Sequence, residues 1–216
     1  MKETLIIWMT NAWKVLSYSH RRIIWNSFLA YIPLVLSFWL FRSSRPRSLT
    51  WWLVFLVFIA FLPNAPYVLT DIIHPINFVR RGYSVWIVTL AVIPQYFLFI
   101  LAGFEAYVIS LMNFGYYLEE EGLKQHIVTM ELVIHALCAV GIYLGRFKRF
   151  NSWDFVTQPD ILAKSIVNDL TGTWEIGIII ITFIVLVILY WLMKQVTLAI
   201  LFRFRYQKVF EQKSNQ

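Results

Sequence analysis

The stretch IGIIIITFIVLVILYWLM fills residues 176–193 and contains no charged side chain. Because about 20 consecutive apolar residues in a helix cross a hydrocarbon core roughly 30 Å thick, this stretch predicts a transmembrane helix. Apolar runs at residues 23–41, 49–62, 85–112 and 127–144 predict further spans. The fold class that follows is all-α, a polytopic transmembrane helical bundle with about five spans.

The composition agrees with a chain that lies mostly in lipid. Of its 216 residues, 59% are hydrophobic and only 14% are charged, whereas about a quarter of a soluble domain is charged. These figures exclude a soluble globular protein, a coiled coil, a collagen and a disordered tail. No repeat or flexible linker divides the sequence, so residues 1–216 are expected to form one integral-membrane domain.

Two segments are expected to lie outside the spans. Residues 1–20 are predicted to form an interfacial amphipathic helix, because the apolar run 5–18 is short and is interrupted by Asn11 and Lys14. Residues 145–174 are predicted to form an extramembrane loop that carries a surface helix, since apolar residues recur there at helical spacing.

The charge balance indicates a partner class. The chain has 19 Lys and Arg against 12 Asp and Glu, a net charge of +7. Because the basic residues flank several spans, anionic lipid head groups are the expected partners, and no soluble basic domain is present that would bind nucleic acid. The Lys and Arg content of the loops does not favour either orientation in the membrane.

A broken helix is predicted at residues 62–75, within the sequence FLPNAPYVLTDIIHP of residues 61–75. Two prolines three residues apart interrupt the preceding helix, Asn64 suits the N-cap of a helix that restarts near Ala65, and Pro75 is expected to end it. Polar side chains then form one stripe, with Thr70 at its border: Asn64, Tyr67, Asp71 and His74. Such a stripe either lines a pocket, as broken helices do in transporters, or faces water at the interface.

The sequence GRFKRFNSWD, residues 145–154, is the second informative segment. Arginines bind phosphate or carboxylate groups through the two-pronged guanidinium, but basic residues beside a span also anchor it at the interface. Asn151 with Asp154 resembles a helix cap, and Trp153 an interface anchor. The candidate binding residues of this segment are Arg146, Arg149, Asn151, Ser152, Trp153 and Asp154.

The two segments are separated by two spans, so both are expected at the same face of the membrane. Asp71 and His74 are therefore predicted to meet the arginines of the second segment in one polar cluster, with separate surfaces as the alternative. His135 is added as a binding candidate, because ionisable residues inside a bilayer are costly and usually functional or paired.

Glu131 and His135 lie four residues apart on one helical face, and the pair fits a hydrogen bond, a proton relay or half of a metal site. The depth of this pair argues against sharing ligands with Asp71 and His74, so no metal site is predicted, and the cofactor stays unknown. Glu105 is expected to be exposed near the membrane boundary.

Both motifs resemble the signature stretches of an uncharacterised bacterial integral-membrane family, domain of unknown function 1361. The resemblance runs from about the first span to the helix after Trp153, and it implies a multi-span fold in the bacterial cytoplasmic (cell) membrane and no activity. The residues that match the family's motifs are Pro63, Asn64, Pro66, Tyr67, Thr70, Asp71, His74, Gly145, Arg146, Arg149, Asn151, Ser152, Trp153 and Asp154.

The leading hypothesis is a polar pocket at one membrane face that binds an anionic head group or amphiphile. Arg146 and Arg149 would engage the negative charge, while Asp71 and His74 would orient the ligand or exchange a proton. One alternative is an intramembrane enzyme on a lipid-linked substrate, with Asp71 and His74 as the catalytic candidates. The other is a non-catalytic subunit of a membrane complex, and a homo-oligomer is compatible with each hypothesis.

Overall fold

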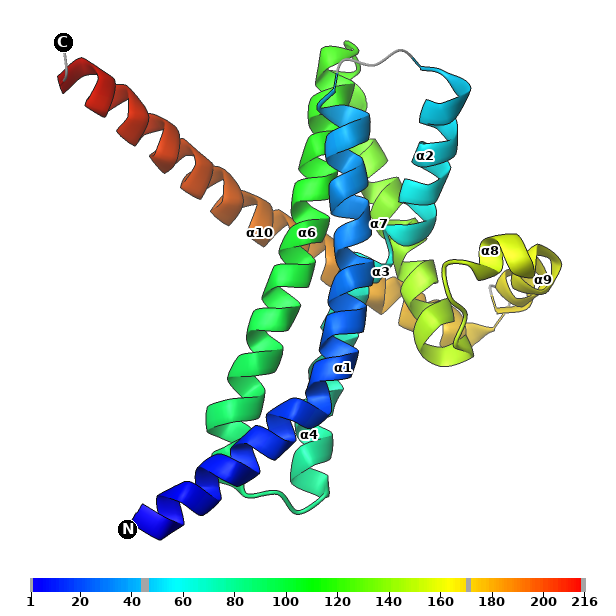
Figure 1. Ribbon diagram of the computed structural model, residues 1–216. Coiled ribbons are helices and arrows are strands. Elements are labelled where there is room, and N and C mark those ends of the chain that lie inside the picture. Colours follow the sequence, from blue (N-terminus) through cyan, green and yellow to red (C-terminus); the bar gives the residue numbers. More distant parts are fainter. Residues whose placement is uncertain (1, 44–46, 170–171, 215–216) are drawn as a thin grey trace.

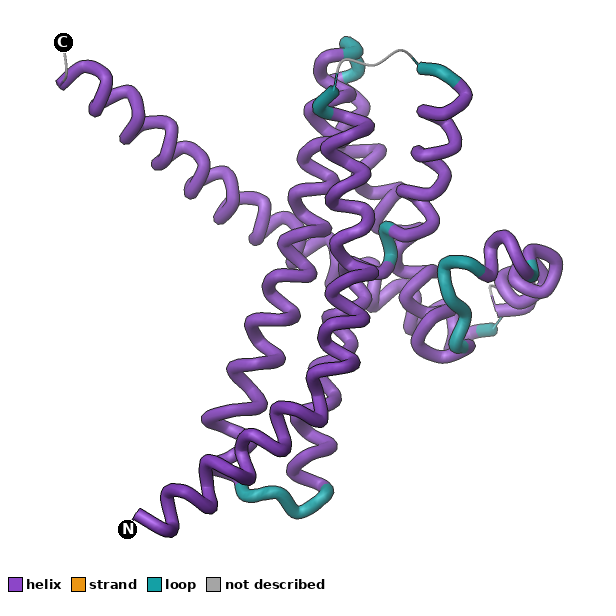
Figure 2. Tube along the Cα trace, in the orientation of Figure 1, coloured by secondary structure: helices purple, strands orange, loops and turns teal. Residues whose placement is uncertain are grey.

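The computed structural model describes residues 2–43, 47–169 and 172–214. Within these ranges the chain is helical and contains no strand, and short loops connect the helices (Figure 2). Five helical stretches in the described part are long and apolar enough to cross a membrane: Ile6–Phe41, Leu49–Arg80, Val85–Glu120, Lys124–Lys148 and Thr173–Gln207. The all-α multi-span fold expected from the sequence is thereby confirmed.

The first span belongs to α1, a single helix over Lys2–Phe41. The segment 1–20 was expected to form an interfacial helix, and its described part, residues 2–20, is continuous with the span. No proline or glycine occurs between residues 2 and 32, so nothing in the backbone ends the helix there. The N-terminal part of α1 runs at an angle to the remainder (Figure 1), and its place at the membrane interface stays a prediction.

The second span is interrupted as expected. Helix α2 covers Leu49–Phe61, and after Leu62 and Pro63 the chain continues as α3 over Asn64–Tyr67. The N-cap position of α3 is Pro63 and not Asn64, whose side chain bonds elsewhere. We call the segment from Pro63 to Ile72 the helix break.

The helix break ends in a 3₁₀ segment and is followed by a further α-helix. A 3₁₀ segment covers Val68–Ile72 and leads into α4 over Ile73–Arg80. The expectation that Pro75 ends the segment is wrong. Pro75 lies in the first turn of α4, where its missing N–H group removes no helical hydrogen bond.

The third and fourth spans each contain one wide, π-helical turn. Helix α5 covers Val85–Ile87, a π segment covers Val88–Val92, and α6 extends over Ile93–Glu120 with Pro94 in its first turn. A 3₁₀ turn over Lys124–His126 leads into α7, and a second π segment follows it. Helix α7 covers Ile127–Tyr143, and its π segment covers Leu144–Lys148.

The remaining helices lie around this bundle. The short helix α8 covers Asp154–Thr157, and α9 covers Pro159–Asp169 within the expected extramembrane loop. Leu162 of α9 packs on Tyr143 and Leu144 at the end of α7, so α8 and α9 stand at the side of the bundle (Figure 1).

Helix α10 covers Thr173–Ser214 and contacts α7 and α6. It crosses the bundle obliquely, and its C-terminal part extends away from the other helices (Figure 1).

Two glycines on neighbouring helices let the helix break approach closely. A Cβ atom at Gly141 of α7 would lie 2.8 Å from the Cβ atom of Pro63, and one at Gly103 of α6 would lie 2.9 Å from a methyl carbon of Val68. Small residues at such crossings allow backbones to pack tightly in membrane bundles. The helix break is thus held between α6 and α7 at a fixed position.

Candidate functional site

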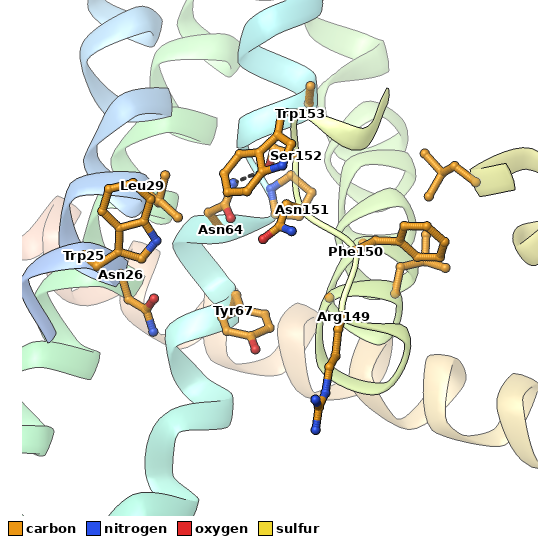
Figure 3. A pocket seen from close by; sticks show the side chains of 16 residues that line it. Trp25, Asn26, Leu29, Asn64, Tyr67, Arg149, Phe150, Asn151, Ser152 and Trp153 are labelled. Carbon is orange, nitrogen blue, oxygen red and sulfur yellow. Dashed lines mark hydrogen bonds between the residues drawn. The ribbon is translucent and has the colours of Figure 1, made fainter. Parts of the chain in front are cut away.

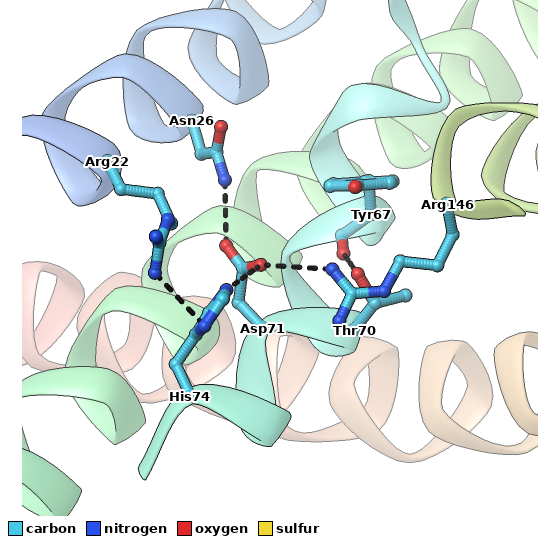
Figure 4. Close-up of polar contacts among 7 residues, drawn as sticks. All are labelled: Arg22, Asn26, Tyr67, Thr70, Asp71, His74 and Arg146. Atoms are coloured by element: carbon cyan, nitrogen blue, oxygen red, sulfur yellow. Dashed lines mark hydrogen bonds and ion pairs between the residues drawn. The ribbon is translucent and has the colours of Figure 1, made fainter. Parts of the chain in front are cut away.

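A buried carboxylate lies at the centre of the site. Asp71 is 2% exposed, and three side chains approach its two oxygens. Asn26 Nδ2 donates to Oδ2 at 2.7 Å, His74 Nε2 lies 3.2 Å from Oδ1, and Arg146 Nη1 lies 3.9 Å from Oδ1 (Figure 4). A buried carboxylate is tolerated only when donors and opposite charges surround it, and these partners meet that requirement.

The same contacts fix the tautomer of His74. Arg22 Nη1 lies 3.0 Å from His74 Nδ1, and a guanidinium can only donate, so Nδ1 accepts and carries no proton. The proton is on Nε2, which faces Asp71. Because both ring nitrogens are engaged, His74 has no free nitrogen that could take a proton from a substrate in this arrangement.

We call Arg22, Asn26, Asp71, His74 and Arg146 the Asp71 cluster. Through Arg146 it joins the segments 61–75 and 145–154, as expected from the two spans between them, whereas Arg149, also expected there, lines the neighbouring cavity. Helix α1 contributes Arg22 and Asn26, and neither residue was predicted from the sequence to belong to the site. The available signal was their spacing of four residues, which places both side chains on one face of a helix.

A cavity of about 220 Å³ lies beside the cluster, between α1, the helix break and the loop after α7 (Figure 3). We call it the first cavity. Trp25 and Trp153 contribute aromatic surface to its wall, and its polar lining consists of Asn26, Asn64, Tyr67, Arg149, Asn151 and Ser152. Since Asn26 also donates to Asp71, the first cavity and the Asp71 cluster share a wall.

Asn64 connects the helix break to the loop after α7. Its Nδ2 donates to Ser152 Oγ at 2.7 Å and to the carbonyl oxygen of Phe61 at 2.9 Å. The amide therefore satisfies the carbonyl of Phe61, because its regular helical partner, the N–H of Ala65, bonds the carbonyl of Leu62 at 3.2 Å. The bond to Ser152 holds residues 151–153 against the cavity.

Arg149 occupies a backbone position that usually belongs to glycine. Its φ is 62° and its ψ 27°, a left-handed conformation, and the N–H of Phe150 bonds the carbonyl of Leu144 at 3.2 Å. In many α-helices a left-handed residue, most often glycine, is followed by an N–H that bonds the carbonyl five positions earlier. Here the bond reaches back six positions, one more, after the π segment. A side chain there costs about 1–2 kcal/mol.

The arginine at this position places a cation at the cavity. The Arg149 side chain points the same way as the Tyr67 hydroxyl (Figure 3), is exposed, and forms no ion pair with any residue that the structure describes.

Two candidate residues stabilise the backbone and do not line the cavity. Asp154 Oδ2 accepts the N–H of Asn151 at 2.6 Å. The pair does not form the helix cap expected from the sequence, because the N-cap position of α8 is Trp153 and Asp154 is its first residue. The Thr70 hydroxyl donates to the carbonyl oxygen of Tyr67 at 2.8 Å. Both contacts hold the segments that carry the lining residues.

His135 lies in a different cluster, away from the Asp71 cluster. Its Nδ1 is 2.6 Å from the hydroxyl of Tyr107, and its ring centroid is 4.7 Å from that of Tyr190. Along α7, His135 and Arg146 are about 16 Å apart by helical rise alone, which explains why the two residues do not meet. The single cysteine, Cys138, is buried on the same helix.

The acidic residues near His135 bind partners on α10. Glu131 Oε1 accepts from Tyr190 and from Lys194, each at 2.6 Å, so Glu131 and His135 do not bond each other as their spacing suggested. Glu105, expected to be exposed, is half-buried and accepts from Thr197 at 2.6 Å. These contacts attach α10 to α6 and α7.

Within the described residues, no three His, Cys, Asp or Glu side chains come together as a metal site requires. A family model described as "Protein of unknown function (DUF1361)" matches residues 25–188. No curated protein and no solved structure matches the chain. The site therefore has to be interpreted from its own geometry.

Proposed function

The chain belongs to the DUF1361 family, whose function is unknown, and from the geometry of the site we propose that this multi-span membrane protein binds the anionic head group of a membrane amphiphile in the first cavity. The observation that carries the proposal is Arg149. A cation stands at the cavity in a strained backbone position and has no carboxylate partner among the described residues.

The charges around the first cavity favour an anion. Arg149 lines it, and Arg146 stands beside it with a single contact to a carboxylate at 3.9 Å, near the limit for an ion pair. Asp71, the acidic member of the cluster, is already surrounded by donors. Guanidinium groups bind phosphate or carboxylate oxygens in pairs, so both arginines can turn toward a ligand.

The size and lining of the cavity favour a head group over a whole amphiphile. A volume of about 220 Å³ is below the roughly 300–1,000 Å³ of pockets that enclose drug-sized molecules. The amide of Asn151 and the hydroxyl of Tyr67 supply neutral donors. In the proposed complex the acyl chains stay in the bilayer, and Trp25 and Trp153 lie at its boundary.

Asp71 and His74 have an orienting role in this proposal. Asp71 holds the Asn26 amide at the wall of the first cavity, and His74 is fixed between Asp71 and Arg22. The engagement of both imidazole nitrogens supports this role over the catalytic one, because a general base needs a free nitrogen within reach of the substrate.

Replacing Arg149 with glycine separates binding from folding. Arg149→Gly removes the cation and also the backbone strain, so we expect unchanged or slightly raised stability, by up to about 1–2 kcal/mol. Affinity for an anionic head group should fall at least ~10-fold, as a lost charged hydrogen bond predicts. Calorimetric titration of the full chain in neutral detergent with dihexanoyl phosphatidic acid measures the second effect, and thermal unfolding measures the first.

Matched variants define the outcome of this experiment. Arg149→Lys retains the charge and should lose less affinity than Arg149→Gly, while Arg205→Gln, an exposed cation on α10, should leave binding unchanged. Dihexanoyl phosphatidylcholine, with no net charge, should bind weakly. Phosphatidic acid that binds Arg149→Gly as tightly as the unmodified chain would contradict the proposal, and so would its failure to bind the unmodified chain.

A further inference from the structure

A second, smaller cavity lies on the other side of His74. It occupies about 110 Å³ and is lined by Tyr18, Arg22, His74, Asn77, Phe78 and Arg81. Residues 18 and 22 belong to α1, whereas residues 74, 77 and 78 belong to α4 and Arg81 follows it directly. We call this the second cavity. Arg22 on α1 and Arg81 at the end of α4, which are far apart in the sequence, each bring one guanidinium to it.

The positive charge at the second cavity is not balanced. Arg22 contacts His74 Nδ1, a neutral acceptor, at 3.0 Å. Arg81 contacts the Tyr18 hydroxyl at 3.4 Å and lies 5.7 Å from the centre of the Tyr18 ring. Neither arginine forms an ion pair with a carboxylate in the part of the chain that the structure describes.

The donors around the second cavity suit a small oxyanion. Each guanidinium has five N–H groups, and Arg22 uses one nitrogen for His74, so donors remain on both arginines. The Tyr18 hydroxyl and the Asn77 amide add neutral donors. The volume is several times the roughly 10–15 Å³ that one water molecule needs, which is room for a tetrahedral anion and too little for an amphiphile.

We propose that the second cavity is a binding site for a phosphate-type oxyanion, held between Arg22 on α1 and Arg81 after α4. Free phosphate and a phosphate monoester at the end of a lipid head group share this chemistry. The site stands on its own residues and does not depend on the head-group binding proposed above. Arg22, His74, Asp71 and Asn26 nevertheless form a continuous series of contacts from the second cavity to the first.

The test compares two neighbouring arginines. Inorganic phosphate is titrated into the full chain in neutral detergent and followed by calorimetry. Arg81→Gln should weaken phosphate binding at least ~10-fold. Arg80→Gln removes the same charge from the adjacent exposed residue, which does not line the second cavity, and should change the affinity less than ~2-fold by lost long-range attraction. Tyr18→Phe, which removes one hydroxyl, should show an intermediate loss.

The outcomes are distinct from those of the Arg149 experiment. Phosphate binding should persist in Arg149→Gly, whereas phosphatidic acid should still bind the first cavity of Arg81→Gln. In Arg149→Gly, displacement of phosphate by dihexanoyl phosphatidic acid would identify a lipid head group as the source of the oxyanion, and its absence would identify free phosphate. Equal losses in Arg80→Gln and Arg81→Gln, or no phosphate binding by the unmodified chain, would overturn the proposal.

Discussion

Replacing Asp71 with alanine is expected to destabilise the folded protein by about 2–4 kcal/mol. The carboxylate accepts a hydrogen bond from Asn26 and lies 3.2 Å from His74 and 3.9 Å from Arg146, in a position that is 2% exposed. Its removal leaves an amide and an imidazole without their acceptor and Arg146 without its counter-charge. The Arg146 side chain is 30% exposed, so water compensates part of the loss, and the expected value lies below that for a fully buried pair.

Unfolding in mixed micelles with increasing sodium dodecyl sulfate, followed by circular dichroism, measures this destabilisation. Asp160→Ala is the matched control, because Asp160 is an exposed carboxylate in the first turn of α9. Its loss should cost no more than about 1 kcal/mol through the helix dipole. If the two variants unfold alike, Asp71 is not the centre of the bundle's polar contacts.

The second large effect is expected from one added methyl group. Gly141→Ala places a Cβ atom 2.8 Å from the ring of Pro63, and a proline ring cannot rotate away. Either α7 or the helix break must shift, so we expect a loss of about 1–3 kcal/mol in unfolding free energy, as for other overpacked interiors. The shift should also lengthen the hydrogen bond between Asn64 and Ser152, because Gly141, Pro63 and both of these residues line the first cavity.

Glycines elsewhere in the chain supply the controls for this prediction. Gly177 lies inside α10, and no atom is found within 4 Å of its added Cβ, so Gly177→Ala should leave stability unchanged or raise it by up to about 1 kcal/mol. Gly145→Ala meets Tyr67 at 3.3 Å and should fall between the two. The same micelle titration ranks all three variants, and an unaffected Gly141→Ala would show that the helix break is not held tightly against α7.

The spans and the helix break were predictable because hydrophobic length and proline act locally. The N-cap role of Asn64 was wrong for the opposite reason. Its amide donates to Ser152, which is 88 positions away in the chain, and a local sequence pattern cannot predict such a distant partner. Likewise, Pro75 was expected to stop a helix and instead lies in the first turn of one, a difference that depends on where the preceding 3₁₀ segment ends.

The candidate site was predictable in part. Topology placed Asp71 and Arg146 at the same end of the bundle, and the two side chains do meet. The contribution of α1 was missed because Asn26 lies inside an apolar run and Arg22 directly before it, where a basic residue commonly flanks a span. Their spacing of four residues marks a shared face, but only the packing of α1 beside the helix break gives that face its partners.

The burial of His135 could be predicted from hydropathy, but its partners could not. Its place in the interior was expected from the apolar residues around it, and it is buried. Its partners, Tyr107 and Tyr190, are aromatic residues on α6 and α10, and oblique crossings of this kind are not encoded in hydropathy. The residue therefore stabilises the attachment of α10 and stands apart from both cavities.

Because Cys138 is buried, it need not be replaced before cysteines introduced elsewhere in the chain are labelled. Cys138 is the only cysteine in the sequence, and it is buried in the hydrophobic core. A membrane-impermeant maleimide should thus leave intact protein unlabelled. A cysteine introduced at Asn151 would line the first cavity, and one introduced at Asn77 would line the second. Labelling of each cysteine by maleimide added to one side of a sealed vesicle would show from which side that cavity is accessible.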